Sequence, residues 1–568
     1  MLYSRVALLI SFLLLINFTF NTDVASDNQQ IIRKQSTSTK ENIKPKLTVI
    51  IVVDQFRADY LPRFNSLFGQ KGFKRLMSQG AYFTNANYAY SNTYTAVGHS
   101  TIVTGSQPSI HGIIGNKWFS RETGKFLRAS EDDKVSGVGV EKGSSPQLLL
   151  TTTIGDQLKL SNNYQSKTFG VSIKDRSAVF TAGLRGSGAY WFDDKSGQMC
   201  SSSYFIKELP EWVVNFNKQR IPDQYFQKTW ERKLSEAAYQ ISDQDDASYE
   251  DTWDGNTKTF PHIIDGNSKE ISPTFYRQFG DSPFSNELLA RFALATIDNE
   301  KLGQGKYPDF LAVSFSAPDL VGHMFGPYSQ EVQDIIIRTD ETIGSFLDEL
   351  DKRLGLNNIL VVLTADHGVA PIPAYARQHN LGGLRMDGLK LRKDMEELLV
   401  NRYGALKKGE EYILGLVNQQ FYLNEALIRE KKLDLKEIED FVGQQAVRTE
   451  GVAAYYTRTK IIAGEISNTD IGQRIVAGFS PERSGNVFLL VKPFVQIAEA
   501  ENEYNGTGHG TPYHYDTHVP IIFMGKQIKS GVYHEACSPS DITPTIATIL
   551  EVEPPSGSVG RVLTEALK

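Results

Sequence analysis

The chain has 568 residues, of which 40% are hydrophobic and 22% are charged, and its formal net charge is −6. These proportions are ordinary for a globular protein and exclude a collagen-like, coiled-coil or disordered description of the whole. Proteins that grip nucleic-acid backbone usually carry a basic excess, so a nucleic-acid polymer is not an expected partner. Two cysteines exclude a disulfide scaffold, and Cys200 and Cys537 either pair or remain free thiols.

The N-terminus has the features of a targeting segment. Arg5 precedes an apolar run over residues 6–16, and small residues follow at 24–26. This order predicts a secretory signal peptide at residues 1–25, and hence a secreted or periplasmic protein. The run is shorter than the ~20 residues of a comfortable membrane span, and an uncleaved anchor is the alternative. The polar residues 26–46 are expected to form a flexible tether. No later stretch is apolar enough to span a bilayer, and a monomer is the expected state.

Folded structure is expected over residues 47–568, as strands that alternate with helices. Five apolar runs predict strands at Leu47–Val53, Thr168–Ile173, Asp309–Phe315, Asn358–Thr364 and His518–Met524. Runs that are apolar throughout are typical of strands buried on both faces. The alternation favours an α/β fold, with a mostly parallel sheet flanked by helices. Two stretches, about 185–300 and about 375–500, fit this pattern poorly and are interpreted as large α+β insertions. The tryptophans of the first are expected to build that insertion's own core.

Four of the predicted strands lead into charged groups, which are Asp54, Lys174, Asp319 and Asp366. An isolated aspartate after a strand is usually a turn or a helix cap. Open α/β sheets, however, bind ligands beyond the carboxyl ends of their strands, so four charged ends favour a shared site.

Three histidines accompany these carboxylates. His367 adjoins Asp366, and His323 lies four residues after Asp319, about one helical turn, so that both can share a face. His509 lies in a glycine-rich loop. Carboxylate and imidazole together suit zinc and related divalent ions. Three carboxylates and three histidines are enough for two sites of three ligands, each with an open position for substrate.

A candidate nucleophile lies between the first two predicted strands. Residues 96–103 can be helical, which would place Thr95 at a helix N-terminus. Free N–H groups and the positive end of the helix dipole favour an anion there. The alternative is that Thr95 is only a cap hydroxyl.

Together these motifs resemble the alkaline phosphatase superfamily, and within it the PafA-type alkaline phosphatases, which are relatives of the nucleotide pyrophosphatase/phosphodiesterases. The matching stretches are Val52–Gln55, Thr93–Ser100, Thr104–Gly112, Ser172–Arg176, Asp319–Pro327, Thr364–Gly368, Gly508–Gly510 and Tyr515–Pro520. The resemblance covers about residues 47–565, and it implies an alkaline-phosphatase-like fold and hydrolysis of small phosphate monoesters.

The resemblance also implies two zinc ions per chain and a role for each candidate residue. One ion would be held by Asp319, His323 and His509, and the other by Asp54, Asp366 and His367. By the same match His509, rather than His514 or His518, is the ligand. Thr95 would be the nucleophile and would form a covalent phospho-threonine. The remaining histidines, His99 among them, are expected to be structural or surface residues.

Three further residues bear on the substrate. Asn116, Lys174 and Arg176 match family residues that contact the non-bridging phosphate oxygens. Lys174 and Arg176 are two apart on a segment expected to be extended, so they could share a face and meet a dianion with charge-assisted hydrogen bonds. The alternative is a solvated strand end. The pair favours a monoesterase.

The same site residues bear on three other activities. A phosphodiesterase or nucleotide pyrophosphatase on the same bimetallic core is the alternative. A sulfatase would need a Cys or Ser before a Pro and an Arg, and the nucleophile segment has neither. A non-catalytic binding protein would predict a missing ligand or nucleophile, and none is missing.

Overall fold

The computed structural model describes residues 44–499 and 505–568. The predicted signal peptide and most of the predicted tether lie outside the described residues. Among the residues described, no helix combines the length and apolar character that a membrane crossing requires.

The main sheet has 11 strands. In spatial order they are β21 (Gly531–Tyr533), β2 (Ala81–Asn87), β20 (His518–Met524), β13 (Ile359–Thr364), β1 (Leu47–Val53), β12 (Asp309–Phe315), β7 (Thr168–Ser172), β8 (Gly188–Asp193), β9 (Gln198–Ser202), β5 (Glu131–Val138) and β6 (Lys142–Ser144). The strands from β13 to β8 run parallel, whereas β20 is antiparallel to both of its neighbours. The predicted mostly parallel α/β sheet is therefore confirmed.

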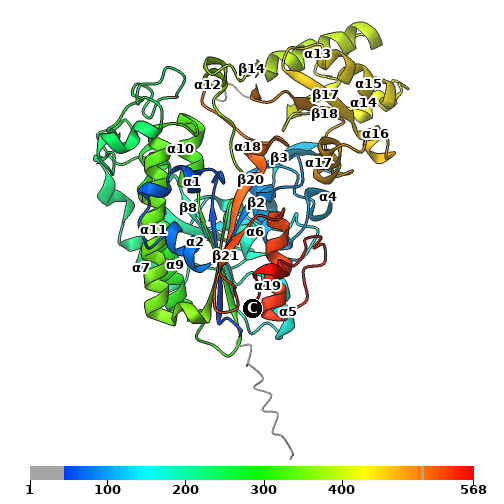
Figure 1. Cartoon of the computed structure of the whole chain (residues 1–568). Coiled ribbons are helices and arrows are strands. Elements are labelled where there is room, and N and C mark those ends of the chain that lie inside the picture. The colour runs from blue at the N-terminus through cyan, green and yellow to red at the C-terminus, as the bar shows by residue number, and fades with distance from the viewer. Residues whose placement is uncertain (1–43, 500–504) are drawn as a thin grey trace, which may run out of the picture. The chain divides into compact units, whose positions relative to one another are not determined.

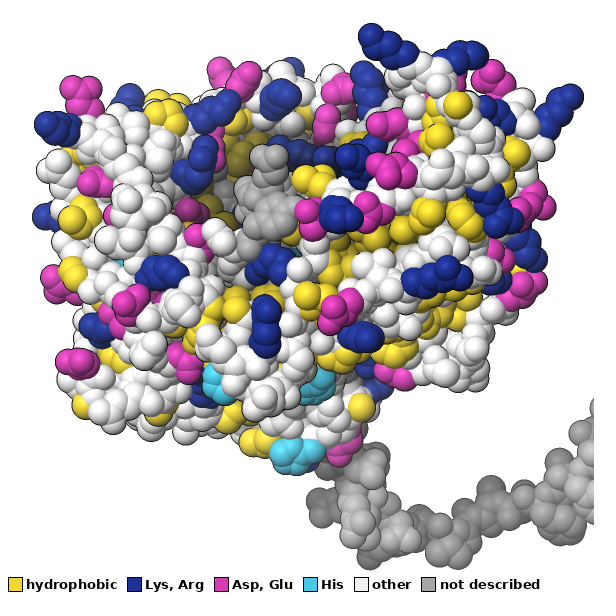
Figure 2. All heavy atoms as spheres, turned by 90° about the horizontal axis from the view of Figure 1, so that it is seen from above, with side chains coloured by type: hydrophobic (Ala, Val, Ile, Leu, Met, Phe, Trp, Pro, Cys, Tyr) yellow, Lys and Arg dark blue, Asp and Glu magenta, His cyan; other side chains and the backbone are white. Residues whose placement is uncertain are grey.

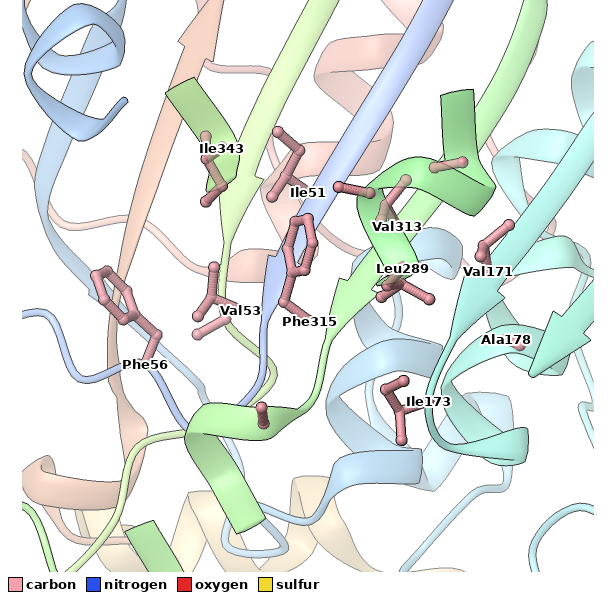
Figure 3. Close-up of a cluster of buried hydrophobic side chains, with 14 of the residues drawn as sticks. Ile51, Val53, Phe56, Val171, Ile173, Ala178, Leu289, Val313, Phe315 and Ile343 are labelled. Carbon is pink, nitrogen blue, oxygen red and sulfur yellow. The ribbon is translucent and has the colours of Figure 1, made fainter. Parts of the chain in front are cut away.

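Strand β1 is buried throughout because it faces two separate layers of the core. Ile51 and Val53 belong to one buried cluster and Ile50 and Val52 to another, as the two-residue period of a strand requires. Figure 3 shows the first cluster, in which Ile51 and Val53 lie near Phe315 of β12. Burying one such side chain is worth about 1.5–3 kcal/mol, so this strand is fixed at the centre of the sheet.

Helices cover both faces of the sheet (Figure 1). The first cluster takes side chains from α2 (Phe73–Gln79), α9 (Pro283–Glu300) and α11 (Gln330–Leu354). The second takes side chains from α3 (Thr95–Thr104), α5 (Ile154–Ser161) and α19 (Ile542–Leu550). Other helices are α1 (Tyr60–Arg63), α4 (Pro108–His111), α6 (Asp175–Ala182), α7 (Glu211–Lys218), α8 (Pro273–Gly280), α10 (Ala317–Phe325), α12 (Pro373–Gln378) and α18 (His514–Thr517).

Residues 384–498 form a second α+β region with its own core cluster. Its sheet has four strands in the order β15 (Ile413–Val417), β16 (Gln420–Leu423), β18 (Val487–Val491) and β17 (Val452–Thr457). Its helices are α13 (Gly388–Tyr403), α14 (Glu425–Glu430), α15 (Leu435–Ala446), α16 (Arg458–Ile462) and α17 (Asp470–Gly478). Strands β14 (Leu384–Asp387) and β19 (Val495–Ala498) pair in parallel and bring the two ends of the region together.

The stretch expected to be a first insertion is built differently. Its first residues form β8 and β9 of the main sheet, and its tryptophans Trp191, Trp230 and Trp253 join the main core cluster. The expectation of a separate core was therefore wrong, because these side chains pack on the layer of α9 and α11. Short strand pairs lie outside the main sheet, at β3 (Lys117–Ser120) with β4 (Lys125–Arg128) and β10 (Lys228–Trp230) with β11 (His262–Ile264). Cys200 and Cys537 are buried free thiols and form no bridge.

Candidate active site

The candidate residues gather at the carboxyl edge of the parallel strands. Asp54 directly follows β1 and Asp366 follows β13, while Asp319 lies on α10 just after β12. These three strands are adjacent and parallel, so their ends meet at one edge, as the rule for open α/β sheets predicts. His509 reaches the same edge from the loop that precedes α18.

Two groups of three side chains could each hold a metal ion. In one group, donor atoms of Asp319, His323 and His509 lie within 4.8 Å of one another, and in the other those of Asp54, Asp366 and His367 do. The groups coincide with the two ligand sets that the sequence motifs implied. The structure thus brings together all six predicted ligands, whereas His514 and His518 lie beside each other and belong to neither group.

The three histidines are oriented alike. Each donates its Nδ1–H to a backbone carbonyl, His323 to Thr507 (2.7 Å), His367 to Gly368 (2.9 Å) and His509 to Thr93 (2.6 Å). A carbonyl only accepts, so Nδ1 carries a proton and the neutral form of each ring has its lone pair on Nε2. Burial lowers the pKa of His367 and of His509, which favours the neutral imidazole that a metal requires.

The carboxylates offer matching oxygen atoms. Asp54 Oδ1 and Asp366 Oδ2 are buried and have no hydrogen-bond partner among the described residues. They lie 3.5 Å and 3.4 Å from His367 Nε2. A buried carboxylate oxygen without a partner is costly, and these two converge with an imidazole lone pair on one point. This donor set fits a divalent cation, and zinc in particular.

One ammonium group lies among the carboxylates. Lys174 Nζ donates to Asp54 Oδ2 at 2.6 Å and also to Asp319 Oδ2. Burial raises the pKa of Asp54 well above its ordinary value, and the charges of Asp319 and Asp366 raise it further. Burial opposes the charge on Lys174, but the two neighbouring carboxylates outweigh it and raise its pKa. Three carboxylates therefore crowd around one ammonium, and a bound cation would relieve the repulsion that raises the pKa of Asp54.

The candidate nucleophile lies beside the second group. Thr95 is the first residue of α3 and is buried, and its Oγ1 is 3.5 Å from His367 Nε2. The next backbone N–H, of Ala96, donates to Asn116 Oδ1 at 2.9 Å. Among the described residues, no acceptor pairs with the Nδ2 of Asn116. That group therefore remains available to a ligand at the helix N-terminus.

The segment of Lys174 and Arg176 differs from the prediction. Lys174 is extended, but helix α6 begins at Asp175, so Arg176 lies in its first turn and the expected extended segment is wrong. The helix begins early because a short connection joins β7 to a helix that packs back on the sheet. The charge of Arg176 opposes the rise that the neighbouring carboxylates cause in the pKa of Lys174. Arg176 Nε is buried without a partner among the described residues.

A cleft of about 590 Å³ opens on the first group. Asn116, His323 and His509 are among the residues that line it. Residues of the 384–498 region also line it, and they include Leu416, Val417, Asn418, Gln419, Val495, Gln496 and Ile497. The sequence analysis assigned this region no part in the site, because no local motif signals it. Figure 2 shows acidic and basic side chains interspersed over the face drawn there.

Two residues next to the ligands were missed. His99, expected to be structural, is buried with its Nδ1 2.8 Å from the Thr95 carbonyl and 3.2 Å from Asp366 Oδ2. Its spacing of four residues from Thr95 on a predicted helix was the available signal. Gln55, adjacent to Asp54, donates hydrogen bonds to Asp319 and Asp366.

The chain matches the family model of type I phosphodiesterases/nucleotide pyrophosphatases over residues 48–516, and it belongs to this family. Within the family it is similar to the PafA-type alkaline phosphatases. Alkaline phosphatase PhoV of Synechococcus elongatus is 38% identical over 92% of this chain and 93% of PhoV. A Myroides odoratus protein named as a calcium-transporting ATPase is 37% identical over 92% of this chain and 95% of that protein.

A solved structure gives the same relationship. Alkaline phosphatase PafA of Elizabethkingia meningoseptica is 36% identical over 92% of this chain and 95% of PafA. The crystal structure of wild-type PafA has a TM-score of 0.86, with 35% identity, and covers 92% of this chain and 99% of that one. The predicted alkaline-phosphatase-like fold is confirmed.

Proposed function

We propose that this protein is a secreted, zinc-dependent alkaline phosphatase that hydrolyses small phosphate monoesters through a phospho-threonine at Thr95. The observation that carries the proposal is the convergence of two groups of three metal-ligating side chains beside a buried hydroxyl at a helix N-terminus. The phosphatase names of PhoV and PafA, which are similar over most of their length, support the same activity.

Asp319, His323 and His509 would hold one zinc ion, and Asp54, Asp366 and His367 the other. Zinc bound there would supply Lewis acidity, which lowers the pKa of a bound hydroxyl and stabilises charge on phosphate oxygens. The surrounding protein orients the atoms that would bind zinc. The three histidines are anchored through Nδ1 to backbone carbonyls, and the two unpartnered carboxylate oxygens lie near Nε2 of His367.

In the proposed reaction Thr95 Oγ1 forms a bond to phosphorus as the bond to the leaving alcohol breaks. Water then cleaves the phospho-threonine and releases phosphate. The position of Thr95 at the start of α3 favours the phosphoryl group, because backbone N–H groups and the helix dipole stabilise an anion. The buried surroundings of Thr95 limit access of bulk water to it.

The free donors around the site suit a monoester dianion. Asn116 Nδ2 and Arg176 Nε have no acceptor among the described residues, and Lys174 carries an ammonium beside both groups. Each charge-assisted hydrogen bond to a non-bridging oxygen contributes about 1.5–3 kcal/mol. A diester has one charged oxygen fewer and would use fewer of these donors. A phosphodiesterase is the second candidate, because the family model bears that name.

The experiment compares p-nitrophenyl phosphate with bis-p-nitrophenyl phosphate as substrates of the purified protein. We expect the larger kcat/KM for the monoester and about two zinc ions per chain by elemental analysis. Thr95→Ser, which keeps a hydroxyl, serves as the matched control for Thr95→Ala, which should abolish turnover. A clear preference for the diester, or full activity of Thr95→Ala, would overturn the proposal.

A further inference from the structure

We propose that Gln55 is a positioning residue that ties the two ligand groups together and selects which carboxylate oxygens face the metals. Gln55 lies in the turn between β1 and α1 and is only 2% exposed. Its backbone contacts a carboxylate of one group and its side chain contacts a carboxylate of the other. The inference rests on the proposed zinc-dependent function.

The backbone of Gln55 adopts a conformation that is unfavourable for residues other than glycine. Its φ is 64°, in the left-handed region, and Phe56 N donates to the Val53 carbonyl at 3.3 Å to close the turn. The third position of such a turn favours glycine, so a glutamine there stores strain. Strain of this kind is retained where the surrounding contacts require it.

The first contact is with Asp366. Gln55 N donates to Asp366 Oδ1 at 3.1 Å, and that oxygen also accepts from His367 N at 3.1 Å. With Oδ1 engaged twice, Oδ2, which lies 3.2 Å from His99 Nδ1, is the oxygen left to face His367 Nε2, at 3.4 Å. The turn thereby fixes the orientation of a predicted ligand of the second group.

The second contact is with Asp319. Gln55 Nε2 donates to Asp319 Oδ1 at 2.7 Å and lies 3.4 Å from the Asp319 carbonyl oxygen. Asp319 Oδ1 is also the oxygen that lies 3.3 Å from His323 Nε2. A hydrogen bond to a ligand oxygen holds its lone pair in direction and tunes its basicity. Gln55 therefore fixes one carboxylate from each group.

Helix α10 leaves room for the side-chain amide of Gln55 at one position. A Cβ placed on Gly322 would lie 1.9 Å from Gln55 Oε1, far inside contact distance. Glycine in the interior of a helix is less stable than alanine. Gly322 therefore lowers the stability of α10, and its lack of a side chain leaves room for Gln55. A strained glutamine and a helical glycine thus occur together, one against the other, and this pairing points to a positioning role.

The test uses zinc binding and the stability of the metal-free protein. Gln55→Gly removes the strain and the side-chain bond together. We expect metal-free protein that is as stable as the wild type or more so, with zinc affinity about tenfold weaker by competition with a chromophoric chelator. Gln227→Gly is the matched control, since Gln227 is exposed and also left-handed, with a φ of 60°. It should leave zinc affinity unchanged.

Gly322→Ala provides a second, independent test. In the wild-type background the new methyl group should displace the Gln55 amide and weaken zinc binding about tenfold. In the Gln55→Gly background it should cost nothing further, because the clash is gone. Equal effects in both backgrounds, or wild-type zinc affinity in Gln55→Gly, would overturn the proposal.

Two further measurements secure this test. If Gln55→Gly cannot be recovered folded, Gln55→Asn is measured in the same way, since asparagine tolerates the left-handed region but is too short to reach Asp319. Wild-type turnover of p-nitrophenyl phosphate tests the proposed function separately. Failure of that activity with tight zinc binding would refute the phosphatase proposal and leave the role of Gln55 standing.

Discussion

Two buried clusters in this protein combine carboxylates with histidine, and they differ in how their polar atoms are arranged. One is the strand-end site. The other, here called the aromatic-walled cluster, contains Glu250, His262 and Glu331. The aromatic-walled cluster takes its name from the rings of Trp230, Trp253, Phe260 and Phe325, which lie 4.9–5.4 Å from the His262 ring. Composition alone would not separate the two clusters.

The atoms that could ligate a metal converge at the strand-end site and do not converge in the aromatic-walled cluster. In the aromatic-walled cluster His262 uses Nε2 to meet Glu331 Oε1 at 2.9 Å, and its Nδ1 has no partner among the described residues. Both Glu250 oxygens are likewise unpartnered there. These three residues do not form a group whose donors all lie within the 4.8 Å seen at each strand-end group.

The two clusters also differ in the charged groups that they hold. Burial raises the pKa of Glu250 to about 9 and lowers that of His262 to about 3, so both are neutral near pH 7. At the strand-end site Lys174 remains an ammonium between Asp54 and Asp319. Burial raises the pKa of Asp54 as it does that of Glu250, so the clusters differ in the ammonium that only the strand-end site holds among its carboxylates and in the converging ligand atoms.

The largest expected effect comes from removing one acid at the strand-end site. Asp366→Asn should lower both zinc affinity and kcat/KM for p-nitrophenyl phosphate by more than about 100-fold, since residues outside the ligands are already worth about 10- to 100-fold. Glu331→Gln is the matched control in the other cluster and should change kcat/KM by less than about twofold. Equal losses in the two variants would abolish the distinction between the clusters.

The next largest effect concerns Lys174, the ammonium group of the strand-end site. Lys174→Ala removes a donor to the non-bridging oxygens, so kcat/KM for the monoester should fall by about 10- to 100-fold, and that for the diester by clearly less. Parallel assays with the two nitrophenyl esters measure the ratio. Lys195→Ala, which removes an exposed ammonium paired with Glu141 at 2.7 Å, is the control. An equal loss for both esters would mean that Lys174 does not read the extra phosphate charge.

The sequence predicted those parts of the molecule that local pattern determines. β1, β12 and β20 begin and end at the predicted residues, because mainly apolar runs between polar segments leave little choice of boundary. The rule that ligands meet strand ends then placed Asp54 and Asp366 at one edge. Zinc, the role of Thr95 and the signal peptide remain predictions.

The sequence did not predict what depends on tertiary packing. The wall of the cleft comes from residues 416–419, whose turn is held by Asn418 Nδ2 on the Lys117 carbonyl at 2.7 Å. Those partners are hundreds of residues apart, and no periodicity connects them. The core position of Trp230 was missed for the same reason, since its neighbours come from distant segments. Gln55 was within a quoted motif, but only the fold shows that it spans both groups.

The smallest expected effect concerns Glu250 in the aromatic-walled cluster. Glu250 has a pKa of about 9 in the folded protein against an ordinary value of 4.5. Between these values the unfolded chain releases a proton that the folded chain keeps, so stability falls as pH rises, by at most about 1.4 kcal/mol per pH unit. Glu250→Gln cannot ionise and should escape this loss.

Thermal unfolding of metal-loaded protein across pH 5–8.5 measures the difference. At pH 8 the Tm of Glu250→Gln should exceed that of the wild type by a few degrees. The gap should shrink towards pH 5, because the loss accumulates only as the pH rises above the ordinary value of 4.5 that holds in the unfolded chain. Glu270→Gln, at an exposed position, is the control. Because Glu250 contributes no ligand atom to either group, kcat/KM should stay within about twofold of the wild type. A gap that does not change with pH would show that Glu250 is ionised in the fold, and the two clusters would then differ in geometry but not in charge.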